Sequence, residues 1–205
     1  MPIDHDNYSD AYIRSILEEV QTIAIVGASA NTVRPSYFVL TYMMSKGYDV
    51  AAVNPGRAPQ PIAGAPCFAS LAETARNFSP SVAGQDFATS KIASPRTDAG
   101  ADAPVENQID LIDIFRNSQA AYGVVEEVLQ LDPLPKVIWM QLGVRNDEAA
   151  RMAEKQGIKV IMNRCPKIEY ARLCGEIGWV GVNRGIISAK KPKLRKGYQR
   201  FDIRQ

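Results

Sequence analysis

Six residues near the N-terminus are the ones best suited to binding a ligand. They are Gly27, Ala28, Ser29, Arg34, Pro35 and Ser36. The first three follow the apolar run 22–26, and small residues after such a strand let the backbone approach a diphosphate. A helix that begins at Pro35 would offer free N–H groups to anionic oxygens, and the Arg34 guanidinium and Ser29 hydroxyl could add to them. This spacing indicates a phosphate-binding βα unit.

The glycine pattern of this unit argues against an ordinary dinucleotide site. Such a site has G-x-G-x-x-G after the first strand, whereas here only Gly27 is present and Ser29 and Thr32 replace the other two glycines. An acid near the end of the second strand would hold ribose hydroxyls, but Asn54 stands there. Arg57 suits a phosphate instead, either the 2′-phosphate of NADP or the 3′-phosphate of coenzyme A (CoA), unless it is a solvated loop residue.

Three further strand ends carry polar or small residues. They are Phe115-Arg116, Gln141-Leu142-Gly143 and Asn163-Arg164-Cys165. Arg116 could contact a phosphate or pair with Asp113. The amides of Gln141 and Asn163 suit an adenine or a pantetheine amide, or they tie loops together.

The chain offers no convincing catalytic group. Cys165 is the most tempting nucleophile, but the one histidine, His5, lies far away in the N-terminal segment. We therefore expect a buried, inert thiol. Glu169 could act as a base one helical turn later, yet carboxylates on helices are usually solvated or paired. We expect no catalytic residue and no metal site, so that a binding protein is favoured over an enzyme.

Apolar periodicity predicts the elements that position these residues. The expected strands are 22–26, 49–53, 109–115, 136–141 and 158–163, with a short one near 67–68, and the expected helices are 8–20, 36–46, 70–76, 119–131, 147–156 and 168–175. Because strands and helices alternate, the fold is predicted to be α/β, a three-layer arrangement around a parallel sheet of about five strands. Ligands of such sheets bind beyond the carboxyl ends of the strands.

Composition restricts the remaining choices. With 205 residues, 46% of them hydrophobic, the chain can form one domain with a sizeable core. It has no apolar run long enough to span a membrane and no signal sequence, and its three cysteines have irregular spacing. These features favour a soluble, cytoplasmic protein. Residues 77–108 are poor in large apolar groups and are expected to be a mobile insertion.

The C-terminal tail, residues 190–205, carries most of the positive charge. It has seven basic residues and one acidic residue, although the whole chain has a net charge of only +2. The remaining body is mildly acidic, which argues against a nucleic-acid-binding surface outside the tail. The tail itself could bind RNA, an anionic membrane or an import receptor, or it is simply solvated.

Seven segments in order resemble a known family. They read I-A-I-V-G-A-S, R-P-S-Y, G-Y-D-V, V-N-P, D-L-I-D-I-F-R, W-M-Q-L-G-V-R-N-D-E-A-A and M-N-R-C-P-K-I-E-Y. Together they resemble the small single-domain CoA-binding proteins of the bacterial YccU-like type. The domain of that family is Rossmann-like and similar to the CoA-binding domain of the succinyl-CoA synthetase α subunit. The resemblance spans most of residues 22–173.

The resemblance implies that CoA lies across the carboxyl edge of the sheet. Gly27, Ala28, Ser29 and Arg34 would be near the diphosphate, Asn54, Pro55 and Arg57 near the adenosine, Phe115 and Arg116 along the cofactor, and Gln141 and Gly143 beside the pantetheine. The family often has Asp in place of Asn163 and His in place of Tyr170, so proton chemistry is not expected there. Ligase activity is not expected either, because the synthetase uses a histidine and a second domain that this chain lacks.

The sequence thus predicts an N-terminal helical segment (1–21), a CoA-binding domain (22–189) and the basic tail (190–205). The favoured function is a non-catalytic carrier, sensor or regulator that binds CoA or acyl-CoA. The alternatives are an NAD(P)-binding oxidoreductase and a CoA-dependent enzyme that uses Cys165 and Glu169. Whether the protein forms a homo-oligomer stays open.

Overall fold

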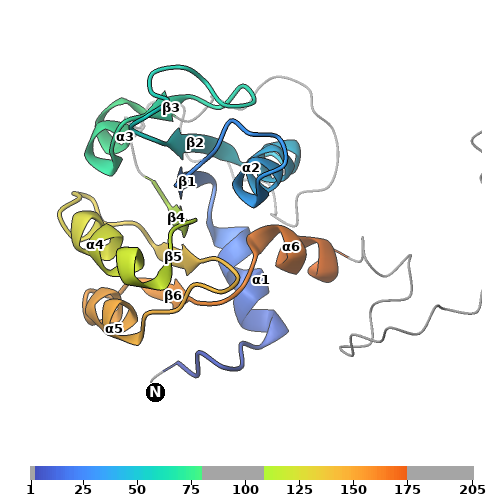
Figure 1. The fold of residues 1–205 in the computed structure, drawn as a ribbon. Coiled ribbons are helices and arrows are strands. Elements are labelled where there is room, and N and C mark those ends of the chain that lie inside the picture. The colour runs from blue at the N-terminus through green and yellow to red at the C-terminus, as the bar shows by residue number, and fades with distance from the viewer. Residues whose placement is uncertain (1–2, 80–108, 175–205) are drawn as a thin grey trace, which may run out of the picture.

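The computed structural model describes residues 3–79 and 109–174, which form alternating strands and helices (Figure 1). The strands are β1 (Thr22–Val26), β2 (Asp49–Val53), β3 (Cys67–Phe68), β4 (Leu111–Ile114), β5 (Val137–Met140) and β6 (Lys159–Ile161). The helices are α1 (Asp10–Glu19), α2 (Pro35–Ser45), α3 (Leu71–Asn77), α4 (Ser118–Val128), α5 (Asp147–Lys155) and α6 (Pro166–Leu173). None of these helices is long and apolar enough to cross a membrane.

All six strands pair in parallel, in the order β3-β2-β1-β4-β5-β6. This is the strand order of a Rossmann fold, and the α/β parallel-sheet prediction is confirmed. The chain moves outward from β1 to one edge and then returns to start β4 on the other side of β1. The connections that leave β1 and β4 therefore diverge, which opens a crevice beyond their carboxyl ends.

Helices cover both faces of the sheet and divide the core into two apolar clusters. Helices α1, α2 and α6 pack on one face, with side chains such as Ile25 and Trp139. Helices α3, α4 and α5 pack on the other, with Ile112 and Ile138. Figure 1 shows the two groups of helices on opposite sides of the strands. Because both faces are buried, the central strands are almost uniformly apolar.

A charged cluster fixes the amino ends of the two central strands. The Asp110 carboxylate accepts hydrogen bonds from the backbone N–H groups of Gln21 and Thr22 (2.8 and 3.1 Å) and pairs with Lys136 at 2.8 Å. Burial raises the pKa of Asp110, but these contacts outweigh it and hold the pKa below its ordinary value. The carboxylate thus stays charged and sets the register between β1 and β4.

The predicted elements differ from the observed ones mainly at their ends. The helix expected to start at 168 begins at Pro166, because proline fits the first helical turn, where its missing N–H is not needed. The sheet has six strands where about five were expected, since the two-residue β3 pairs with β2. The expected insertion falls mostly in residues 80–108 and the basic tail in 190–205, both outside the described residues.

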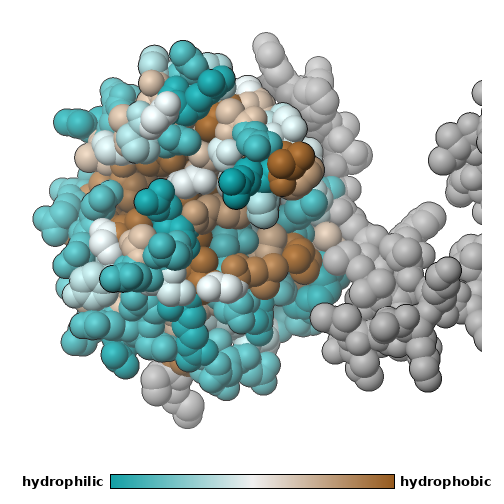
Figure 2. All heavy atoms as spheres, viewed as in Figure 1, coloured by the Kyte–Doolittle hydropathy of each residue, from teal (hydrophilic) through white to brown (hydrophobic). Residues whose placement is uncertain are grey.

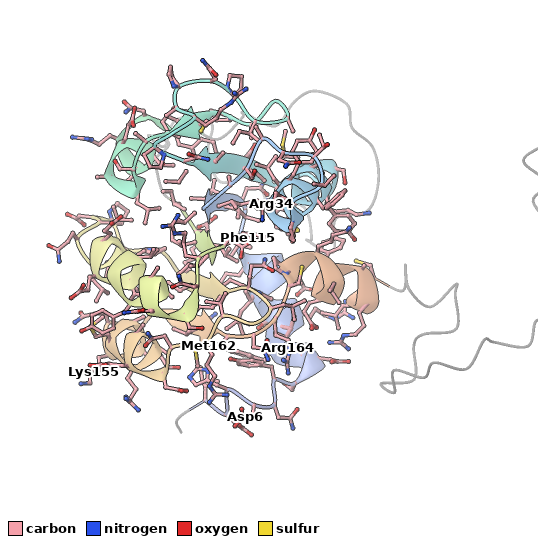
Figure 3. All side chains as sticks on the ribbon, viewed as in Figure 1. Asp6, Arg34, Phe115, Lys155, Met162 and Arg164 are labelled. Atoms are coloured by element: carbon pink, nitrogen blue, oxygen red, sulfur yellow. The ribbon has the colours of Figure 1, made fainter. Side chains whose placement is uncertain are left out.

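The N-terminal segment packs against the loop after β6 through Tyr8. The backbone N–H of Met162 donates a 2.9 Å hydrogen bond to the Tyr8 hydroxyl, which also lies 2.9 Å from His5 Nδ1. The guanidinium of Arg164 sits 5.5 Å from the centre of the Tyr8 ring. Asp6, Met162 and Arg164 accordingly lie close together in Figure 3. Tyr8 therefore links the start of the chain to the far end of the sheet.

Removing this hydroxyl should lower the free energy of unfolding. Tyr8→Phe leaves the buried Met162 N–H without a partner, which costs about 1–3 kcal/mol. Urea denaturation monitored by circular dichroism measures the loss. Tyr122→Phe is the matched control, since its hydroxyl makes no hydrogen bond to residues 3–79 or 109–174, and it should unfold like the parent. Equal midpoints for the two variants would contradict the role assigned to Tyr8.

Candidate functional site

A cavity of about 650 Å³ opens at the carboxyl ends of the strands, where the switch in strand order places the crevice. Its volume is that of an ordinary ligand pocket. It is lined by Val26, Gly27, Ala28, Ser29, Arg34, Pro35, Ser36, Val53, Asn54, Pro55, Ala69, Ser70, Leu71, Phe115, Arg116, Val124 and Glu127. The walls thus come from the loops after β1, β2, β3 and β4 and from the helices beside them.

Ten of the thirteen residues predicted from the sequence line this cavity. They are Gly27, Ala28, Ser29, Arg34, Pro35, Ser36, Asn54, Pro55, Phe115 and Arg116. Arg57, Gln141 and Gly143 do not line it. Arg57 lies three residues beyond Asn54 in an exposed turn, whereas Gln141 is buried. The carboxyl edge therefore brings most of the candidate residues together, as expected for a parallel sheet.

Gly27 lets two loops approach each other at the floor of the cavity. Its φ is +86°, a conformation that side-chain-bearing residues rarely adopt, and its N–H donates to the Val53 carbonyl at 3.1 Å. A Cβ at this position would lie 2.7 Å from the Phe115 carbonyl oxygen and 3.1 Å from Arg116 Cδ. The loop after β4 can therefore come this close to the end of β1 because residue 27 has no side chain.

Positive charge surrounds this floor. The exposed side chains of Arg34 and Arg116 line the cavity. Arg57 does not line it, but follows the lining residue Asn54 by three positions. None of the three guanidiniums has a hydrogen bond or ion pair with any described residue. Arg34 is also the N-cap of α2, and no side chain caps that helix. Unpaired arginines beside an uncapped helix N-terminus favour an anionic ligand.

Asn54 joins the two loops on the adenosine side of the expected site. Its Nδ2 donates to the Ala28 carbonyl at 2.8 Å, and its Oδ1 accepts from the Gly56 N–H at 2.9 Å. The amide therefore holds the β2 loop against the β1 loop. Glu127 is the one carboxylate among the lining residues, and it comes from α4, not from the end of β2. The acid that would hold the ribose of a dinucleotide is absent from this wall.

Gln141 has a structural partner that the sequence did not reveal. Its Nε2 donates to both carboxyl oxygens of Asp113, at 2.9 and 3.0 Å. Asp113 is fully buried between Ile25 and Trp139 in the sheet. Burial raises the pKa of Asp113 to about 8, although the Gln141 hydrogen bond opposes the rise. The alternative of an Arg116–Asp113 pair is thus not what the structure shows.

Asn163 ties two loops together. Its Oδ1 accepts from the Gly143 N–H at 2.8 Å, and its own N–H donates to the Val144 carbonyl at 3.1 Å. Of the two alternatives for this amide, the structure shows the loop tie. The β5–α5 loop and the β6–α6 loop are therefore held as one unit.

Cys165 and Glu169 are not arranged for catalysis. Burial raises the pKa of the Cys165 thiol, which favours the unreactive neutral form near pH 7. Glu169 pairs with Arg172 at 2.7 Å. His5 lies beside Glu154, 3.3 Å away, in the N-terminal cluster with Tyr8. Within residues 3–79 and 109–174, no three His, Cys, Asp or Glu side chains gather as a metal site.

Part of the cavity lining was not predicted from the sequence. Ala69, Ser70 and Leu71 enter from the β3–α3 junction, and Val124 and Glu127 enter from α4. Ser70 carries a recognisable signal, the pattern S-x-x-E. Its Oγ accepts a hydrogen bond from the Glu73 N–H, and the Glu73 carboxylate accepts one from the Ala69 N–H. That capping box marks a helix start at the carboxyl edge. Val124 and Glu127 show no such signal, since they continue an ordinary helical pattern.

Comparison with known proteins decides the family. A family model described as "CoA binding domain" matches residues 21–171, which is most of the chain. The chain belongs to the CoA-binding domain family. The family resemblance expected from the sequence is thereby confirmed. The residues that line the cavity all fall within the matched region.

Other proteins resemble this chain over most of its length. The uncharacterized protein YneT of Bacillus subtilis is 30% identical over 165 residues, which covers 80% of this chain and 96% of YneT. A hypothetical protein from Pyrococcus horikoshii has a solved structure with a TM-score of 0.62 and 27% identity, covering 85% of this chain and 99% of that one. A Thermus thermophilus structure gives 0.60 and 28%, covering 81% and 99%. The fold of this chain is therefore shared by proteins from distant organisms.

Proposed function

We propose that this protein is a non-catalytic module that binds CoA or an acyl-CoA at the carboxyl edge of its sheet, as a carrier, sensor or regulator. The observation that carries the proposal is the cavity itself. It combines the close approach of the Phe115 backbone to Gly27, an uncapped helix N-terminus and two unpaired arginines. In a member of the CoA-binding domain family, these features suit the phosphates of CoA.

The residues of the cavity divide naturally along such a ligand. The diphosphate would lie against residues 27–29 and 34–36, where small side chains and helix N–H groups meet. The adenosine would lie toward Asn54 and Pro55, with Arg57 at its 3′-phosphate. Phe115 and Arg116 would follow the cofactor toward the pantetheine, which would pass Gly143. Gln141 would act indirectly, through its hold on Asp113.

We propose no catalytic residue because the candidate reactive groups are buried or paired. The Cys165 thiol is buried with a raised pKa, and Glu169 is paired. Asp113 is sealed within the sheet by Gln141. None of these three groups is among the residues that line the cavity. A cytoplasmic location stays a prediction from the sequence, which leaves the oligomeric state open.

Isothermal titration calorimetry with CoA and 3′-dephospho-CoA tests the proposal. We expect CoA to bind and dephospho-CoA to bind roughly tenfold more weakly, because a charge-assisted contact to the 3′-phosphate is lost. Arg57→Ala should weaken CoA binding by a similar factor and leave dephospho-CoA binding unchanged. The two ligands would then bind that variant equally.

The control for this experiment is Arg151→Ala, which removes an exposed arginine on α5, outside the cavity. It should retain the preference for CoA. NADPH is the third ligand, since an oxidoreductase would bind it and change its fluorescence. Binding of NADPH together with no heat from CoA at high micromolar concentration would overturn the proposal in favour of the dinucleotide alternative.

A further inference from the structure

The large hydrophobic side chains that remain exposed lie at one edge of the molecule. Among the described residues, these are Val33, Phe38, Leu142 and Ile168, with exposed fractions from 45% to 73%. Val33 and Phe38 flank the start of α2, Leu142 follows β5, and Ile168 is in the first turn of α6. All four positions belong to the carboxyl edge of the sheet, where the cavity opens. Exposed apolar groups that gather in one place mark a binding surface.

Contacts between the elements place three of these residues on adjoining parts of this edge. The Lys167 ammonium lies 5.7 Å from the centre of the Phe38 ring, so that the first turns of α2 and α6 meet there. Ile168 is the next residue on α6. The loop that carries Leu142 is bonded to the loop before α6 through the Gly143–Asn163 hydrogen bond. Figure 2 shows hydrophobic surface over α6 and beside α2. We call Phe38, Leu142 and Ile168 the apolar rim.

Phe115 connects the apolar rim to the cavity. It lines the cavity, and its partly buried side chain also packs against the core cluster that contains Val39 of α2 and Cys165 at the start of α6. Figure 3 shows Phe115 close to Arg34, near the phosphate end of the site. Phe115 thus belongs both to the cavity and to the side of the sheet that α2 and α6 cover.

We propose that the apolar rim of Phe38, Leu142 and Ile168 holds the acyl chain of a medium-chain acyl-CoA, which makes the thioester the preferred ligand over free CoA. This inference rests on the proposed function, because it assumes that the nucleotide part of CoA occupies the cavity. The pantetheine arm is long and flexible, and its thiol end carries the acyl group. An acyl chain placed on exposed apolar side chains removes both surfaces from water.

A second copy of the chain is the other occupant to consider. A stable interface buries about 800 Å² on each partner and involves roughly 20–30 residues a side. The apolar rim has three large side chains, and the charged Lys167 lies among them. That area suits a single hydrocarbon chain better than a protein surface.

The test compares CoA with acetyl-, butanoyl- and octanoyl-CoA by calorimetry on the full chain. We expect affinity to rise with chain length, with octanoyl-CoA binding about tenfold or more tightly than CoA, since each buried methylene favours binding. Leu142→Asp and Ile168→Asp should abolish this gain and leave the affinity for CoA itself within about twofold. Both positions are exposed, so the variants should fold, which thermal melting checks.

Gln130→Asp is the matched control, because it places the same charge in an exposed turn beyond α4, away from the rim. It should keep the full preference for octanoyl-CoA. Equal affinity for CoA and octanoyl-CoA in the parent would overturn the acyl inference but leave the proposed function intact. Absence of CoA binding would instead remove the proposed function. If the aspartate variants dissociate a dimer and the parent shows no chain-length preference, the rim is a contact between copies.

Discussion

Gly27→Ala should weaken CoA binding at least tenfold and destabilise the protein more than an ordinary glycine replacement. The new Cβ would stand 2.7 Å from the Phe115 carbonyl oxygen, which is backbone and cannot turn aside. The positive φ of Gly27 costs roughly 1–2 kcal/mol for any L-residue. The clash adds about 1–3 kcal/mol, as expected for overpacking. Relief of the clash requires the Phe115 loop to move away from β1, which widens the floor of the cavity.

Gly157→Ala separates the cost of the positive φ from the cost of the clash. Gly157 has φ +80° and no atom within 4 Å of its Cβ position, so its replacement introduces the strain without the clash. It closes α5 at a distance from the cavity. We expect a loss of roughly 1–2 kcal/mol in the free energy of unfolding and no change in CoA affinity. Urea denaturation and calorimetry measure both quantities. Equal losses of stability in the two variants would show that the approach of Phe115 is unimportant.

Asp113→Asn should remove the fall in the free energy of unfolding that Asp113 causes in the parent between pH 5 and pH 8. Burial raises the pKa of Asp113 from 3.8 to about 8, so the folded protein binds this proton more tightly than the unfolded chain. The contribution of Asp113 to the free energy of unfolding is therefore full below pH 3.8 and falls as the pH rises toward 8. Between pH 5 and pH 8 the loss attributable to this group is on the order of 4 kcal/mol, at about 1.4 kcal/mol per pH unit.

Asparagine imitates the protonated acid, because it is neutral and its Oδ1 can still accept the hydrogen bond from Gln141. The variant should match the parent only below about pH 3.8, exceed it modestly at pH 5 and exceed it most at pH 8. Denaturation midpoints at pH 5 and pH 8 test this. Asp110→Asn is the control, since that carboxylate is charged and paired with Lys136. It should destabilise the protein at neutral pH. Parallel pH profiles for the parent and Asp113→Asn would contradict the assignment.

The fold could be predicted well because its signals are local. The apolar run 22–26, the small residues after it and Pro35 each have a direct physical meaning at their own position. Parallel pairing then brings the strand ends together without further information. The short strand predicted near 67–68 is present as β3. The exact helix ends depend on tertiary contacts, and these are where the prediction and the structure differ.

The candidate site was harder to predict where residues act through partners. Nothing in the order Asp-Ile-Phe indicates that Asp113 is buried and bonded to a glutamine 28 positions later. Gln141 was therefore expected beside the ligand, and it lies beside Asp113 instead. Asn163 had two alternatives that only the position of Gly143 could decide. Such pairings are set by long-range packing, which a pattern of residue types does not encode.

The position of β1 has a consequence for how binding and folding are coupled. One wall of the cavity comes from the chain up to residue 71 and the other from residues 115–127, and the hydrogen bonds between β1 and β4 join them. A ligand in the cavity touches both halves and neither half alone forms the site. Bound CoA would thus oppose separation of the two halves. The melting temperature would rise in proportion to the logarithm of the CoA concentration.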